Sequence, residues 1–200
     1  MSLLRIFGWK IVTVSQALEA TFGRFACLTF DGLDSATKCA PTLAKRRAPA
    51  TVFVVTRGGP SLNKLIPLAK AGWEVGSLGH ELVDLTAQSY VQQRRLVSRS
   101  FSLIAAKVGV APRVFAYPFG AYDATTLSCV KSEGFEAAVT LRQGLNGDEG
   151  EAFQLKRMPL KASILPDLVI LLRSILFKTA QQGQQVHHDP RESISAGAAL

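Results

Sequence analysis

The run ATVFVVT at residues 50–56 limits the fold of this chain more than any other feature of the sequence. It is apolar and β-branched almost throughout, without the polar–apolar alternation of a half-exposed strand. Strands covered on both faces have this composition, and they belong mainly to parallel sheets. Shorter strand-like runs recur along the chain and alternate with helix-like segments. This alternation predicts an α/β fold, with helices outside a mostly parallel sheet or barrel.

The individual elements follow from the hydrophobic pattern and from end signals. Strands are expected at 25–30, 50–56, 73–78, 114–117, 137–141 and 153–159, and helices at 34–46, 61–71, 86–108 and 123–134. Gly109 follows the longest helix as a C-cap, and Asp123 is placed to cap the next one. Pro166 is expected to open a last apolar helix, which is too short to span a bilayer.

The length of 200 residues suits one domain. We expect this domain to cover 1–180, and the polar segment 181–200 to be a disordered tail. The three cysteines are scattered without a CxxC pair, so the sequence indicates neither a disulfide framework nor a zinc knuckle. The N-terminus lacks the features of a signal peptide, which favours a cytoplasmic location and leaves other locations open.

The balance of charge points to anionic partners. Lys and Arg number 23 against 15 Asp and Glu, which gives a formal net charge of +8. Nucleic acid, anionic glycans and membrane surfaces attract such a chain. Basic and aromatic residues do not interleave as a base-stacking platform needs, so we do not expect nucleic-acid binding. A basic interaction module for another anionic partner stays open, and the oligomeric state is not indicated.

Candidate site residues follow the predicted strands, where parallel sheets and barrels form their sites. Asp31 ends the first strand in CLTFDGLDSA and can serve as a general base or as a metal ligand. His80 lies in the segment 76–84, after the third strand. The turn Pro118-Phe119-Gly120 follows the fourth strand, and its backbone N–H groups can face a developing oxyanion.

Five segments together resemble the polysaccharide deacetylase family, the carbohydrate esterases with a chitooligosaccharide deacetylase homology domain. In order they are LTFDG, ATVFVV, GWEVGSLGHELVDLT, FAYPFGAYD and GFEAAVT, and the likeness covers about residues 4–160. The resemblance implies a distorted, incomplete (β/α) barrel. It also implies hydrolysis of an N- or O-acetyl group of an oligo- or polysaccharide, with a divalent metal, usually zinc, polarising the carbonyl and activating water.

The resemblance also implies roles for individual residues. Asp31 would be the catalytic base or a metal ligand, and His80 a metal ligand. Phe119 would support the oxyanion through its backbone N–H. The neighbouring Tyr117, Pro118 and Gly120 would contact the substrate. From this pattern we expect that Asp31→Ala abolishes any activity and leaves the fold intact.

The sequence departs from the family pattern at the metal site. The first motif has one acid where the family has two, and an ungapped match places Leu78 and Leu82 at the two metal-binding histidines, with His80 between them. A gapped match allows His80 to be the second ligand. Ala116 stands where an arginine often orients the base. Two interpretations follow: a metal-dependent hydrolase of N-acetylated sugars, or a degenerate homologue that binds glycan or another anionic partner without turnover.

Overall fold

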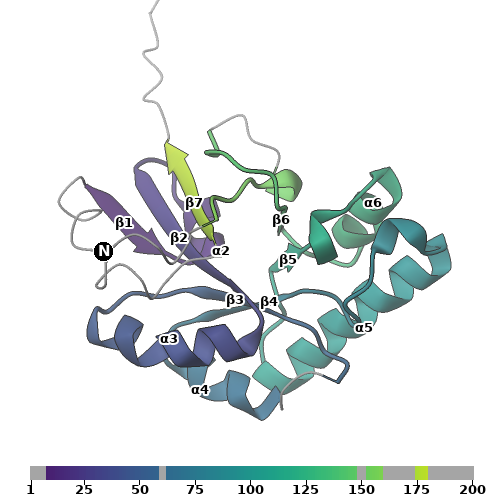
Figure 1. Cartoon of the computed structure of the whole chain (residues 1–200), viewed down its shortest axis with the longest axis horizontal. Helices are drawn as coiled ribbons and strands as arrows, with labels where there is room; N and C mark the ends of the chain where they lie inside the picture. The colour runs from purple at the N-terminus through teal and green to yellow at the C-terminus, as the bar shows by residue number, and fades with distance from the viewer. Residues whose placement is uncertain (1–7, 59–61, 148–151, 160–173, 180–200) are drawn as a thin grey trace, which may run out of the picture.

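The computed structural model describes residues 8–58, 62–147, 152–159 and 174–179, the last segment through its backbone (Figure 1). Six parallel strands form the sheet in the order β1-β2-β3-β4-β5-β6, and β7 pairs with β2 in the antiparallel sense. The strands are β1 (Trp9–Val12), β2 (Arg24–Asp31), β3 (Thr51–Val54), β4 (Glu74–Ser77), β5 (Val114–Ala116), β6 (Ala137–Val139) and β7 (Ser174–Thr179).

Helices cover the outside of this sheet. The α-helices are α2 (Val14–Glu19), α3 (Leu33–Lys45), α4 (Leu65–Lys70), α5 (Tyr90–Val108) and α6 (Ala124–Ser132). Short 3-10 helices are η1 (Leu62–Lys64), η2 (Leu85–Ala87), η3 (Pro118–Gly120) and η4 (Ala152–Gln154). Figure 1 shows α3, α4 and α5 along one side of the curled sheet and α6 beside its β5–β6 end. The incomplete (β/α) barrel expected from the sequence is therefore confirmed.

Alternate residues of the strands face two sides of the sheet, as the two-residue period of a strand requires. One side packs against the helices. Its buried residues on the central strands are Leu28, Phe30, Val52, Val54, Phe115 and Tyr117. The other side lines the inside of the half-barrel. Its buried residues on the same strands are Phe25, Cys27, Phe53, Val114 and Ala116. Asp31 has the same parity as Cys27, so the end of β2 presents its carboxylate on the inner side.

The inner side is tightly filled at the middle of the sheet. Phe53 of β3 is in register with Asp31 on one side and with Gly76 of β4 on the other. A Cβ atom added at Gly76 would lie 2.6 Å from the Phe53 ring and 2.9 Å from Val114. The Phe53 ring therefore occupies the space above Gly76, and only glycine leaves room for it there.

A polar cluster closes the opposite end of the half-barrel, around Glu74 at the start of β4. The Glu74 carboxylate accepts hydrogen bonds from the hydroxyl groups of Ser15 and of Thr51, the latter at 2.7 Å. The Val14 N–H donates to the Thr51 hydroxyl at 3.1 Å. These bonds attach the first turn of α2 to the sheet. Burial, and then the nearby Glu74, raise the pKa of the inward-facing Cys27.

Two expectations about the C-terminal part were wrong. Ser174–Thr179 is a strand, although the sequence predicts a helix there; the rest of that predicted helix lies outside the described residues. Periodicity alone cannot show whether a short apolar run is a helix or a strand, and here the run pairs with β2 as a strand. The predicted strand at 153–159 is instead η4 followed by isolated bridge positions, of which Leu155 pairs with Val139.

The end signals were read correctly. Gly109 adopts φ 80° after α5, and the Asp123 side chain accepts a hydrogen bond from the Thr126 N–H at the start of α6. Of the helices in the described ranges, none combines the length and the hydropathy that a bilayer crossing needs.

Candidate functional site

Asp31 is held at the mouth of the half-barrel by the end of β2. The next residue, Gly32, has φ 102° and forms the N-cap of α3, so the chain turns sharply into the helix. The Gly32 N–H donates to the Phe53 carbonyl at 2.9 Å, which continues the pairing with β3 beyond the strand end. The turn leaves the Asp31 side chain 20% exposed.

Arg157 binds this carboxylate in a bidentate ion pair. Its two terminal nitrogens lie 2.7 Å from Asp31 Oδ1 and 2.9 Å from Asp31 Oδ2. The Arg157 side chain is only 3% exposed. Paired N–H···O bonds of this kind fix a carboxylate in orientation as well as in position.

Arg157 is itself fixed by the segment around it. Its Nε donates to the Thr140 carbonyl at 2.8 Å, and its backbone N–H donates to the Arg142 carbonyl at 2.9 Å. The guanidinium lies over the Phe53 ring, 5.9 Å from the ring centre. Three of the five guanidinium N–H groups are thereby committed, and the face of the group rests on an aromatic ring.

Sequence reasoning missed Arg157. The residue lies 126 positions from Asp31, in a segment with no motif, so no spacing pattern could connect the two. The one available signal was Ala116, which stands where the family resemblance expects an arginine to orient the base. Arg157 brings a guanidinium to Asp31 from a later segment of the chain.

The turn at 118–120 carries backbone strain on the same rim. Phe119 has φ 58° and ψ 8°, in the left-handed region, and its side chain is 60% exposed. This conformation costs a bulky residue about 1–2 kcal/mol. Gly120 has φ 73°, and an added Cβ there would lie 2.8 Å from Leu141. Strain of this kind persists where the surroundings enforce it, often at binding sites.

Tyr117 faces the other way. The residue is 1% exposed, and its hydroxyl donates to the Phe153 carbonyl at 3.0 Å. Its ring stacks on Tyr122, with the ring centres 4.7 Å apart. Tyr117 is therefore buried as a whole residue, and a direct substrate contact does not fit this packing. Pro118 is buried beside it.

His80 lies in a different hollow from Asp31. The residue is 8% exposed, and its Nδ1 lies 2.8 Å from the Thr56 hydroxyl. The hollow around it has a volume of about 520 Å³ and is lined by residues of α5 and of the loops after β3 and β4, without Asp31. Burial, and then the cation of Arg99, lower the pKa of His80 below its usual value.

The residues at the family's metal position do not fit a three-ligand metal site. Both oxygens of Asp31 bind Arg157, and the His80 ring faces Thr56. Leu78 is buried in the inner core and Leu82 is 52% exposed, and neither offers a ligand atom. Within the described ranges, no three His, Cys, Asp or Glu side chains come together around one point. His187 and His188 lie outside those ranges.

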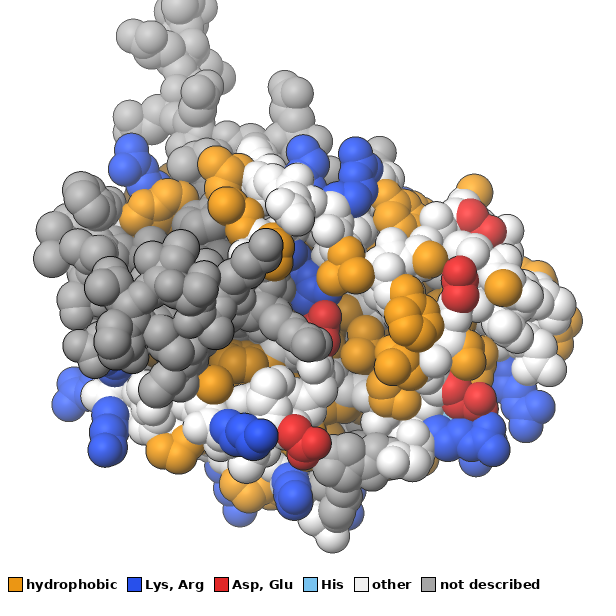
Figure 2. Space-filling model, in the orientation of Figure 1, with side chains coloured by type: hydrophobic (Ala, Val, Ile, Leu, Met, Phe, Trp, Pro, Cys, Tyr) orange, Lys and Arg blue, Asp and Glu red, His pale blue; other side chains and the backbone are white. Residues whose placement is uncertain are grey.

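Exposed apolar residues adjoin, in the sequence, the residues that hold the ion pair. Leu141 follows Thr140 and Met158 follows Arg157, and these two side chains are 54% and 42% exposed. Leu141 lies against Gly120, next to the exposed Phe119. Figure 2 shows hydrophobic side chains gathered over the β5, β6 and α6 part of this face, and a basic and an acidic side chain meeting near its centre. The site thus combines one fixed carboxylate with an apolar rim.

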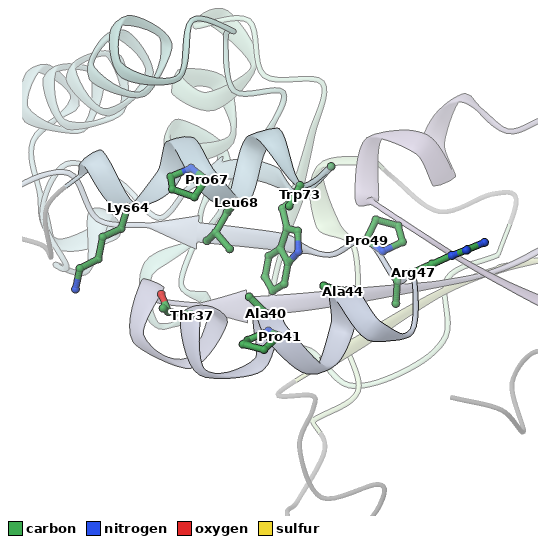
Figure 3. Close-up of a pocket in the computed structure, with 13 residues that line it drawn as sticks. Thr37, Ala40, Pro41, Ala44, Arg47, Pro49, Lys64, Pro67, Leu68 and Trp73 are labelled. Carbon is green, nitrogen blue, oxygen red and sulfur yellow. The ribbon is translucent and has the colours of Figure 1, made fainter.

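A larger hollow, of about 910 Å³, lies outside the sheet between α3 and α4 (Figure 3). Alanine, proline and leucine side chains form its walls, and Trp73 lies between the two helices. Its charged lining residues are Arg47 and Lys64, and its lining includes no carboxylate or histidine. Without an acid or a base, it is not a candidate for hydrolytic chemistry.

Comparisons with known proteins place this geometry in a family. The family model of the polysaccharide deacetylases matches residues 19–138. None of the curated protein sequences matches the chain. The chain belongs to the polysaccharide deacetylase family.

Solved structures show the same fold. The deacetylase PplD of Streptococcus pyogenes, solved with acetate, is 20% identical over 85% of this chain and 82% of its own, with a TM-score of 0.74. The BpsB deacetylase domain of Bordetella bronchiseptica is 21% identical over 78% of this chain and 80% of its own, with a TM-score of 0.67. A mutant of BA3943, described as a pseudoenzyme of carbohydrate esterase family 4 with restored activity, is 20% identical over 56% of this chain and 43% of its own, with a TM-score of 0.52.

Proposed function

We propose that the protein binds N-acetylated polysaccharide at the rim around Asp31, and that it does so without metal-dependent deacetylation. The family supports acetylated carbohydrate as the ligand class. One observation carries the second part. Arg157 occupies both oxygens of Asp31, the one acid of the site. The ungapped match places leucines at both expected histidine positions, and His80, the candidate of the gapped match, faces Thr56.

Asp31 can still contact a ligand. A carboxylate has about four lone-pair sites, and Arg157 uses two of them. The side chain keeps 20% of its surface exposed. A free site can accept a hydrogen bond from the N–H of an acetamido group or from a sugar hydroxyl. The exposed Phe119 and Leu141 offer apolar surface for the acetyl methyl group.

BA3943 is described as a pseudoenzyme, and a mutant of it with restored activity has this fold. That description supports the proposal that family members can lose activity and keep the fold. The loss here would affect the metal ligands and leave the surface around Asp31 in place. In the wild type we therefore expect no stoichiometric zinc after dialysis. Leu78→His combined with Leu82→His, which restores the histidine spacing, is expected to increase zinc retention.

A second candidate function is hydrolysis itself, and a specific observation favours it. The Asp31–Arg157 pair is an oriented carboxylate suited to accept a proton, and the strained Phe119 turn is suited to support an oxyanion. A hydrolase would use Asp31 as the base that takes a proton from water. It would also have to polarise the acetyl carbonyl, and the described residues do not form a metal site that could do so.

One pair of measurements separates the two candidates. Calorimetry with chitopentaose and with its fully deacetylated form measures binding and its dependence on the acetyl group. Acetate release from chitopentaose, with and without added zinc, measures turnover. Acetyl-dependent binding without acetate release supports the proposal. Zinc-stimulated acetate release that Asp31→Asn abolishes would favour the hydrolase, and absence of acetyl-dependent binding would refute the proposal.

A further inference from the structure

The hollow that contains His80 concentrates positive charge. Arg57, from the loop after β3, forms one wall, and Arg95 and Arg99 of α5 form the other. One carboxylate, Glu81, lies among them and forms an ion pair with Arg57. Three guanidinium groups against one carboxylate leave an excess of two positive charges. In the described residues, neither Arg95 nor Arg99 has an ion-pair partner.

The sequence of α5 makes this excess costly for the helix. Tyr90–Val108 contains four basic residues and no acidic one. Arg95 and Arg99 are four positions apart, where like charges on one helix face repel by about 0.2–0.5 kcal/mol. No carboxylate at a neighbouring position of the helix relieves this repulsion. An anion held between the two guanidinium groups would relieve it.

The other lining groups are also suited to an oxyanion. Gln92 lies one turn before Arg95 on the same side of α5 and carries two amide donors. The Thr56 hydroxyl and the His80 ring, bonded to each other, line the hollow between the arginine walls. The hollow has no aromatic ring other than His80 among its lining residues, so it lacks the stacking surface of a nucleic-acid site.

We propose that the hollow lined by Arg57, Arg95 and Arg99 is a binding site for a tetrahedral oxyanion of the phosphate or sulfate class. Guanidinium groups bind such oxyanions through paired, charge-assisted hydrogen bonds. The volume of about 520 Å³ lies within the range of small-molecule sites and exceeds what a free oxyanion fills, so a sugar that carries the anion also fits. This inference does not depend on the chemistry at Asp31.

Titration calorimetry of the full chain with sodium sulfate tests the site, with sodium chloride at equal ionic strength as the reference. The test variant is Arg95→Gln combined with Arg99→Gln. Arg94→Gln is the matched control, because Arg94 lies on the same helix and does not line the hollow. All three arginines of α5 are exposed, so the variants should fold, which circular dichroism checks.

We expect the double variant to bind sulfate at least about tenfold more weakly than the wild type, because it loses charge-assisted hydrogen bonds. The control should stay within about twofold of the wild type. An equal loss in Arg94→Gln, or wild-type binding of sulfate no stronger than of chloride, would overturn the proposal.

A heparin-derived tetrasaccharide and its desulfated form distinguish the two sources of the anion. Tighter binding of the sulfated sugar than of free sulfate, lost in the double variant, places the oxyanion on a glycan. Equal affinity for the sulfated sugar and for free sulfate, again lost in the double variant, assigns the site to a free anion. Binding of the desulfated sugar as tightly as the sulfated one would contradict the site in either form.

Discussion

The ion pair between Asp31 and Arg157 makes a strong prediction about stability. Arg157→Met keeps much of the side-chain volume and removes the charge, so it leaves the Asp31 carboxylate and the Thr140 carbonyl without their donors. Removing one partner of a buried pair typically costs about 3–5 kcal/mol. With a urea m-value of about 2 kcal/mol per M, the unfolding midpoint should fall by about 1.5–2.5 M.

A double-mutant cycle isolates the interaction from the loss of packing. Asp31→Asn leaves the Arg157 guanidinium unpaired at 3% exposure, so this variant is destabilised too. The double variant Asp31→Asn with Arg157→Met removes both charges. It should be less destabilised than the sum of the single changes by about 2–3 kcal/mol, because neighbouring partners couple. Urea unfolding followed by circular dichroism and by tryptophan fluorescence measures all four proteins.

Arg142→Met is the control for this cycle. Its side chain is exposed, and its backbone carbonyl still accepts the Arg157 N–H. We expect a change within about 0.5 kcal/mol. Effects of Asp31→Asn and Arg157→Met that add within about 0.5 kcal/mol would refute the reasoning. So would an Arg157→Met change no larger than that of the control.

Three further predictions concern single positions. Gly76→Ala should destabilise the fold by about 1–3 kcal/mol, because its methyl group would overlap the Phe53 ring; an unchanged melting temperature would contradict that packing. Phe119→Gly should raise the free energy of unfolding by about 1 kcal/mol by removing the left-handed strain, and a loss of stability would show that the exposed ring contributes more than its backbone costs. The pKa of His80, followed by NMR, should lie below its usual value of about 6.5 and rise in Arg99→Gln. Below about pH 6.5 the folded state then binds fewer protons than the unfolded state, so the free energy of unfolding falls as the pH falls through that value. A urea unfolding midpoint that does not change between pH 5 and 7.5 would argue against this.

The fold was largely predictable because its signals are local. The apolar run at 50–56, the C-cap Gly109 and the cap Asp123 each act over a few residues, and the structure uses all three as expected. The strand β7 was not predictable in this way. Its pairing with β2 joins segments about 150 residues apart, and no local pattern encodes such a partner.

In the candidate site, too, the residues marked by local signals were predictable and their long-range partners were not. Asp31 and the turn at 118–120 could be placed at the rim, since both follow directly from strands. The residues that contact them in space, such as Arg157, could not be predicted. The sequence predicts that Asp31→Ala leaves the fold intact, whereas the structure predicts a cost, because a buried guanidinium would lose its counter-ion. His80 was placed near Asp31, but β3 lies between their strands, which separates the strand axes by about 10 Å.

The position of Arg157 in the chain has a consequence for how the site assembles. The segment that the family model matches ends at residue 138, nineteen residues before Arg157. During synthesis the whole parallel sheet can be complete while the carboxylate at the end of β2 still lacks its counter-ion. Contacts between residues so far apart in sequence form late, because the long loop between them must close first. A chain that ends directly after β6 would therefore hold all six parallel strands and still lack the counter-ion of Asp31, because Arg157 lies beyond the segment that the family model matches.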